Sequence, residues 1–174
     1  VIDPHARPAR SAAGSFAKLL YFWTAYVFGG VAWLYPRRVT SRLVVFDRYY
    51  HDILADPRRY RFLAAPGLMR LARALGRRLP MPDLVFILDA APELLQARKQ
   101  EVPLAETARQ RDAYLALAGE LENTHVIDAG KPLDQVVASV LGHVVAAMEA
   151  RTHRRLGVDR SADEKEKEAA AWKA

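Results

Sequence analysis

Short apolar runs alternate with longer segments of helical pattern along the chain. The runs are rich in β-branched residues and lie at residues 42–46, 84–88 and 124–129. Asp47, Asp89 and Asp128 stand at their ends. Helices are predicted at 16–35, 66–78, from Pro92 onward, at 102–122 and at 131–150. Continuous apolar strands separated by helices predict a parallel sheet covered by helices on both faces.

The helix predicted at 16–35 has an unusual pattern. Leu19 to Tyr35 contains no charged residue, and its apolar side chains lie all round the helix. Such a helix is buried in protein or in lipid, and Gly29 and Gly30 predict a bend within it. A span near residues 19–35 in a membrane-associated protein is the alternative, although about 20 apolar residues are normally needed.

Composition narrows the class of protein. The chain has 174 residues, half of them hydrophobic and a quarter charged, which predicts one globular domain at 1–150 and a charged tail at 151–174. The absence of cysteine excludes disulfides and suits a cytoplasmic location. The histidines lack metal-ligand spacing, including His5, His51 and His125, so no metal site is predicted. The net charge of +6 favours partners that carry phosphate.

The ends of the strands are the place to expect a site. In open parallel sheets, ligands bind beyond the carboxyl ends of the strands. Asp47 and Arg48 follow the first apolar run, Asp89 follows the second, and Asp128 lies near the end of the third. On its own, the Asp47–Arg48 pair is also typical of a structural ion pair or helix cap. Asp89 and Asp128 are interpreted as caps or turn residues.

Four segments resemble the thymidylate kinase family, in the same order. They are "VVFDRYYHD", "PDLVFILDAAPELLQAR", "ETARQRDAYLALA" and "HVIDAGKPLDQVV", and the resemblance covers residues 39–148. The chain is most similar to the thymidylate-kinase-like proteins of bacterial polysaccharide gene clusters. The resemblance implies a three-layer P-loop-kinase-like α/β fold, a nucleoside monophosphate kinase-like activity, and the cofactors ATP and Mg²⁺. It implies a nucleoside monophosphate or related phosphorylated small molecule as partner, no nucleic acid or membrane, and allows a homodimer.

The resemblance also implies roles for charged residues. Arg48 would hold the acceptor phosphate, and Asp47 would order the acceptor or the water shell of the magnesium. Arg98, Arg109 and Arg111 would clamp the transferring phosphate. Because Arg109 and Arg111 are two residues apart, they cannot share a helix face, and we expect at least one to be merely solvated.

Aromatic residues are further candidates by resemblance. Tyr49 would pack near the acceptor sugar, and the helix with Trp23 and Tyr26 would line the pocket for the acceptor base. The alternative is that Trp23 and Tyr26, with Phe22, are core residues.

The departures from the family concern the donor side. No G-x-x-x-x-G-K-[ST] phosphate loop occurs in the sequence, and the first residues resemble family sequence that lies after that loop. The resemblance therefore implies a chain truncated at its N-terminus, without the central first strand and inactive alone. The short lid "KQEVPLAET" carries no arginine of its own. A nucleotide-binding module without catalysis remains an alternative.

Overall fold

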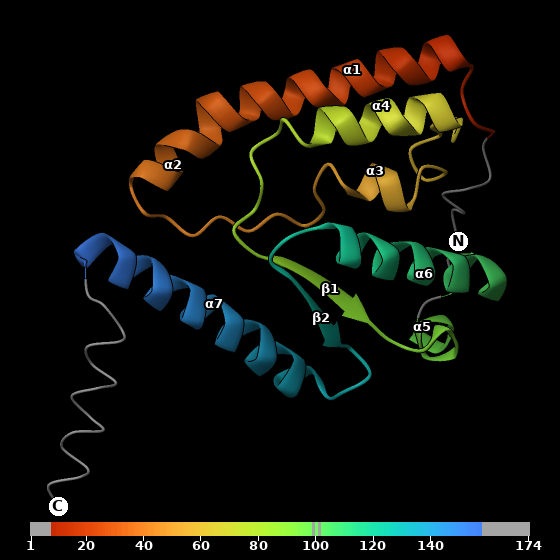
Figure 1. Cartoon of the computed structure of the whole chain (residues 1–174). Coiled ribbons are helices and arrows are strands. Elements are labelled where there is room, and N and C mark those ends of the chain that lie inside the picture. The colour runs from red at the N-terminus through yellow and green to blue at the C-terminus, as the bar shows by residue number, and fades with distance from the viewer. Residues whose placement is uncertain (1–7, 99, 101, 158–174) are drawn as a thin grey trace, which may run out of the picture. The chain divides into compact units, whose positions relative to one another are not determined.

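The computed structural model describes residues 8–98, 100 and 102–157. It contains helices and a small sheet (Figure 1), and the chain divides into two compact units, Val1–Val126 and Ile127–Ala174. The helices are α1 (Ala12–Gly29), a π-helix (Gly30–Leu34), α2 (Tyr35–Val39), α3 (Asp52–Ala55), α4 (Pro66–Gly76), α5 (Pro92–Arg98), α6 (Leu104–Glu120) and α7 (Leu133–Leu156). The mixed α/β class is confirmed.

Two of the three predicted strands form. β1 (Val85–Asp89) and β2 (Thr124–Asp128) pair in a parallel two-stranded sheet. The amide of Val85 donates to the carbonyl oxygen of Asn123 at 3.0 Å, at the start of the pairing. α5 and α6 lie between the two strands in the sequence, as a parallel crossover requires.

The predicted strand at 42–46 is wrong. These residues are extended but unpaired, and Leu43 and Val45 are 66% and 81% exposed. A strand is held by ladder hydrogen bonds to a neighbour, and the sheet of the described residues contains only β1 and β2. The run has the β-branched composition of a strand, but it has no neighbouring strand among the described residues with which to pair.

α1 begins four residues before the predicted start at 16. The Ser11 side chain accepts a hydrogen bond from the amide of Gly14 at 3.2 Å, so the helix starts at Ala12. After Gly29 the α-helix continues as a π-helix, and Gly29 keeps a right-handed helical backbone conformation. The glycine pair thus marks an irregularity in the helix, where a bend was predicted. A Cβ on Gly30 would lie 2.9 Å from Cγ of Pro80, so glycine allows this close approach.

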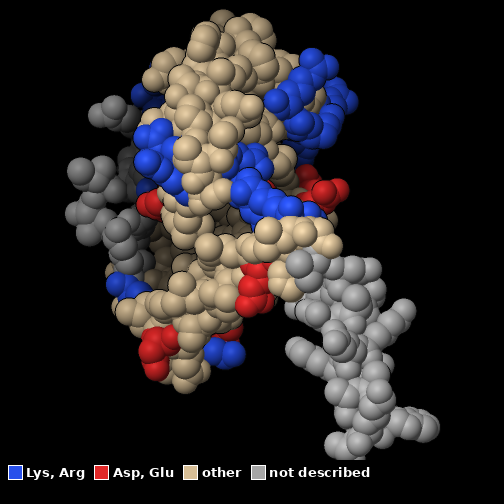
Figure 2. Space-filling model, turned by 90° about the vertical axis from the view of Figure 1, so that its left-hand side faces the viewer, with Lys and Arg blue, Asp and Glu red and all other residues tan. Residues whose placement is uncertain are grey.

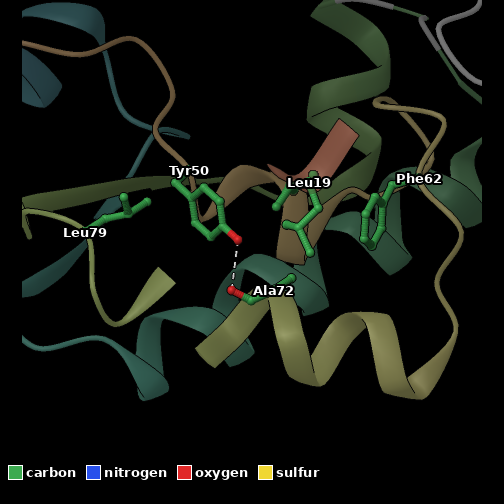
Figure 3. Packing of buried hydrophobic residues seen from close by; sticks show 6 residues of the cluster. Leu19, Tyr50, Phe62, Ala72 and Leu79 are labelled. Atoms are coloured by element: carbon green, nitrogen blue, oxygen red, sulfur yellow. Dashed lines mark hydrogen bonds between the residues drawn. The ribbon is translucent and has the colours of Figure 1, made fainter. Parts of the chain in front are cut away.

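The core of the first unit forms around α1 and α4. Its buried members lie between residues 19 and 79, and several are drawn in Figure 3. They are Leu19, Tyr50, Ile53, Phe62, Ala72 and Leu79. The Tyr50 hydroxyl donates to the carbonyl oxygen of Ala72 at 2.9 Å, which satisfies a buried polar group.

The protein does not bury α1 all round, which is one of the two forms of burial predicted for it. Ser15 and Leu19 are fully buried, whereas Tyr21 and Phe28 on other faces are 68% and 72% exposed. Only one stripe of the helix meets the core, so α1 carries more apolar side chains than this unit buries.

Figure 2 shows a face on which neutral residues cover most of the surface and Lys and Arg side chains stand in separate groups.

The predicted span at 19–35 is divided among α1, the π-helix and α2. Among the described helices, α7 is the one long and apolar enough to cross a membrane by length and composition, a property that some helices of soluble proteins share. α7 continues six residues past the predicted domain end at 150, and Gly157 ends it at φ 66°. His5 and most of the predicted tail lie outside the described residues.

Candidate functional site

Arg48 lies between the extended segment 42–46 and α3. Its backbone is in the left-handed region, at φ 73°. The guanidinium Nη1 donates to Oδ2 of Asp52 at 2.7 Å and to the Tyr114 hydroxyl at 3.4 Å. No contact within the described part of the chain uses Nε or Nη2, and the side chain is 42% exposed. Nη1 of the guanidinium is thus anchored, whereas Nε and Nη2 make no hydrogen bond to the described residues.

Asp52 is the acceptor at the centre of this cluster. Its side chain is only 7% exposed, and its Oδ2 also accepts from the Tyr60 hydroxyl at 2.7 Å. The Tyr114 hydroxyl donates to Oδ1. Burial alone would raise the pKa of Asp52, but the hydrogen bonds from Tyr114, Tyr60 and Arg48 outweigh it and lower that pKa. Burial and the bond to Asp52 raise the pKa of both phenols, so they remain donors at neutral pH.

The lowered pKa of Asp52 predicts acid sensitivity. A carboxyl group with a depressed folded-state pKa adds stability above its ordinary pKa of about 3.9, and this stability is lost as pH falls through the folded value. We expect Asp52→Asn to cost about 1–3 kcal/mol at neutral pH by leaving buried donors poorly paired. Urea unfolding between about pH 6 and pH 3 should then show a shallower decline for the variant than for the wild type. Parallel declines would contradict the role given to this carboxylate.

A second buried carboxylate lies one turn further on. Asp56 is 2% exposed, and its Oδ2 accepts from Nε2 of Gln110 at 3.1 Å. Asp52 and Asp56 are four residues apart, as are their α6 partners Gln110 and Tyr114. The two pairs fix α3 against α6 at both ends of the short helix.

Arg109 and Arg111 point to different partners, as their spacing predicts. Nε and Nη2 of Arg111 donate to the two oxygens of Asp89, at 2.6 and 2.8 Å. Nη2 of Arg109 donates to Glu106 at 2.6 Å. The expectation that one of them is merely solvated is wrong, because carboxylates lie within reach of both. Asp89, at the end of β1, is the ion-pair partner of Arg111, a role beyond the predicted cap or turn, and the hydrogen bond from Arg111 lowers its pKa.

The remaining charged candidates are not hydrogen-bond partners of Arg48. Its contacts run to Asp52 and Tyr114 and include neither Asp47 nor Arg98. Asp47 is exposed, and Arg98 is the exposed last residue of α5. Asp128 accepts from the amide of Gly130 at 2.9 Å, which makes it the turn residue that the sequence predicts.

The aromatic candidates pack tightly. The Tyr49 hydroxyl donates to the carbonyl oxygen of Pro80 at 2.6 Å, and Nε1 of Trp23 donates to that of Leu75 at 3.2 Å. The rings of Tyr26 and Tyr49 meet edge to face, with their centroids 4.9 Å apart. Tyr26 and Tyr49 line a pocket with room for about one water molecule. In this structure these rings and Trp23 pack against the core, as the core alternative has it.

Three residues of the cluster were not predicted from the sequence. Asp52, Tyr60 and Tyr114 all contact one another or Arg48. Asp52 follows Arg48 by four residues, a spacing that indicates a pair only if the backbone turns as a helix does. Tyr114 lies in the segment "ETARQRDAYLALA", but no role was predicted for it, and it is 66 residues from Arg48.

Comparison with known proteins supports the resemblance. No family model matches the chain. A probable thymidylate kinase of Pyrobaculum aerophilum is 31% identical over 113 residues, covering 60% of this chain and 55% of the relative. A probable thymidylate kinase of Archaeoglobus fulgidus is 32% identical over 114 residues, and the thymidylate kinase of Leifsonia xyli 30% over 115, each covering 60% of this chain and 54% of the relative.

The chain is thus a mixed α/β protein with arginines beyond the ends of its apolar runs. Over the matched residues it is similar to thymidylate kinases, which supports the family resemblance predicted from its motifs. The chain spans about half the length of the curated relatives it matches.

Proposed function

We propose that this chain forms the acceptor side of a nucleoside monophosphate kinase-like phosphotransferase. The observation that carries the proposal is the guanidinium of Arg48, anchored through Nη1 and open at its Nε and Nη2 edge. Such an edge matches two oxygens of a phosphate, which lysine cannot do. The names of the similar proteins, all thymidylate kinases, support a nucleoside monophosphate as acceptor.

Phosphoryl transfer depends on placing the acceptor in line and neutralising charge, more than on covalent chemistry. Arg48 would bind and orient the acceptor phosphate, and Asp47 would contact the acceptor side next to it. Arg109 and Arg111 would add positive charge toward the transferring group, together with Arg98. Tyr49, Tyr26 and Trp23 would serve the acceptor only if their packing opened, since their pocket holds about one water molecule.

The part of the chain that the structure describes offers no clustered ligands for Mg²⁺. Among the described residues, no group of three or more His, Cys, Asp or Glu side chains is arranged to hold a metal ion. The sequence also lacks a Walker-type phosphate loop, whose backbone amides hold donor phosphates. We therefore assign only acceptor contacts to this chain and propose that a phosphate loop and a central strand outside these residues complete the three-layer fold. The missing loop equally favours a nucleotide-binding module without catalysis.

Calorimetric titration of the chain tests the acceptor site. We expect thymidine monophosphate to bind more tightly than thymidine, because the phosphate adds charge-assisted hydrogen bonds to Arg48. Arg48→Ala should weaken monophosphate binding about 10- to 100-fold, the worth of such bonds, and leave thymidine unaffected. Arg70→Ala, an exposed arginine of α4, is the matched control. Equal affinities for the two compounds in the wild type would rule out the proposed site.

A further inference from the structure

The Asp52 carboxylate joins three parts of the first unit. Arg48 comes from the loop before α3, Tyr60 from the segment after it, and Tyr114 from α6. Oδ2 accepts from Arg48 and Tyr60, both at 2.7 Å, and Oδ1 accepts from Tyr114. Because both oxygens hold donors from different directions, the carboxylate cannot rotate without breaking a hydrogen bond.

This arrangement fixes the plane of the arginine. The guanidinium is rigid and planar, so tying Nη1 to Asp52 and Tyr114 limits the directions that Nε and Nη2 can take. The left-handed backbone of Arg48, at φ 73°, is a conformation that costs energy for a residue other than glycine. The ion pair with Asp52 offsets that cost and orders a side chain that otherwise has many rotamers.

Resting on the proposed function, we propose that Asp52, held by Tyr60 and Tyr114, is a positioning residue that points the Nε–Nη2 edge of Arg48 toward the acceptor phosphate. Tyr114 lies on the same helix as Arg109 and Arg111. The carboxylate therefore also holds α6, the helix that carries these two arginines, next to the loop of Arg48. It acts through Arg48 and does not itself touch the acceptor.

The choice of variant follows from charge. A carboxylate beside a phosphate-binding arginine lowers the local positive charge, so removing Asp52 changes both the orientation of Arg48 and the field at the phosphate. Tyr114→Phe removes a hydroxyl that holds Asp52 and leaves every formal charge in place. It therefore isolates orientation from electrostatics.

The experiment is a mutant cycle with thymidine monophosphate as the probe and calorimetry as the measurement. Tyr114→Phe should weaken monophosphate binding about three- to tenfold, the worth of one hydrogen bond, and leave thymidine binding unchanged. In an Arg48→Ala background the same substitution should have no further effect, because it acts only through the arginine. Tyr60→Phe repeats the test from the other oxygen if Tyr114→Phe fails to fold.

Tyr50→Phe is the matched control. It also removes a buried hydroxyl from a hydrogen bond, to the carbonyl oxygen of Ala72 at 2.9 Å, but that hydroxyl is not a hydrogen-bond partner of Asp52. It should lower the melting temperature while leaving monophosphate affinity unchanged. The proposal is overturned if Tyr114→Phe binds like the wild type, if its loss persists without Arg48, or if Tyr50→Phe has the same effect. If the wild type itself does not prefer the monophosphate to thymidine, the proposed function fails and this inference fails with it.

Discussion

Phe62→Ala is expected to lower the free energy of unfolding by about 3–5 kcal/mol, the usual cost of emptying a buried aromatic site. Phe62 is 2% exposed and lies in the core with Leu19 and Ala72 (Figure 3). Its backbone is fixed on both sides. Its amide donates to the carbonyl oxygen of Pro57 at 2.9 Å, and the next amide, of Leu63, donates to Oγ of Ser15 at 3.0 Å. Because the segment cannot collapse into the cavity, we expect a value toward the upper end.

Urea unfolding followed by circular dichroism measures this change. Phe28→Ala is the matched control, because Phe28 is 72% exposed on α1 and a surface substitution usually changes stability by less than about 0.5 kcal/mol. A similar loss from both variants, or none from Phe62→Ala, would mean that the cluster around Phe62 is not the core of this unit.

Most elements of the fold were predictable from local signals. Pro66 and Pro92 open α4 and α5, as their fixed φ angle favours at the first helical position. The runs at 84–88 and 124–129 correspond to β1 and β2. These signals succeed because the residues that set each boundary lie within the element itself.

The two differences between predicted and observed fold, at residues 42–46 and in α1, share a physical cause. The run at 42–46 has the composition of a strand, but a strand also depends on a neighbour that local sequence does not specify. The apolar pattern of α1 likewise shows which faces of the helix are apolar. It does not show which of these faces other parts of the protein bury. Exposed side chains such as Val45 and Phe28 are the result in both cases.

The candidate site was only partly predictable. Arg48 and Arg111 stood out through a family resemblance, whereas Asp52 and Tyr114 did not, and Asp89 was assigned another role. Arg111 pairs with Asp89, 22 residues away, and Arg48 reaches Tyr114 across 66 residues. Such pairs depend on how α6 packs, which the hydrophobic pattern of one segment does not encode. The departure from the family pattern at the phosphate loop, in contrast, is read directly from the sequence.

The kinase activity itself is testable in a chain extended upstream with the first strand and phosphate loop of a thymidylate kinase. There, Arg48→Ala is expected to lower the rate of phosphoryl transfer to thymidine monophosphate by about 10²- to 10³-fold, which is typical for removing one oriented donor. Arg48→Lys should recover little of this loss, since a point charge cannot reproduce the planar fork.

Steady-state kinetics with both substrates varied locates the effect. A contact kept from ground state to transition state appears in the KM for the monophosphate, and one that strengthens during transfer appears in kcat. The KM for ATP should stay nearly constant, because the donor binds the added loop. Arg70→Ala controls for the loss of a positive charge elsewhere on the first unit. If the extended chain transfers phosphate and Arg48→Ala leaves the rate intact, the ion pair with Asp52 is structural and the acceptor phosphate binds elsewhere. If the extended chain binds both nucleotides but transfers nothing, the binding-module alternative is the correct one.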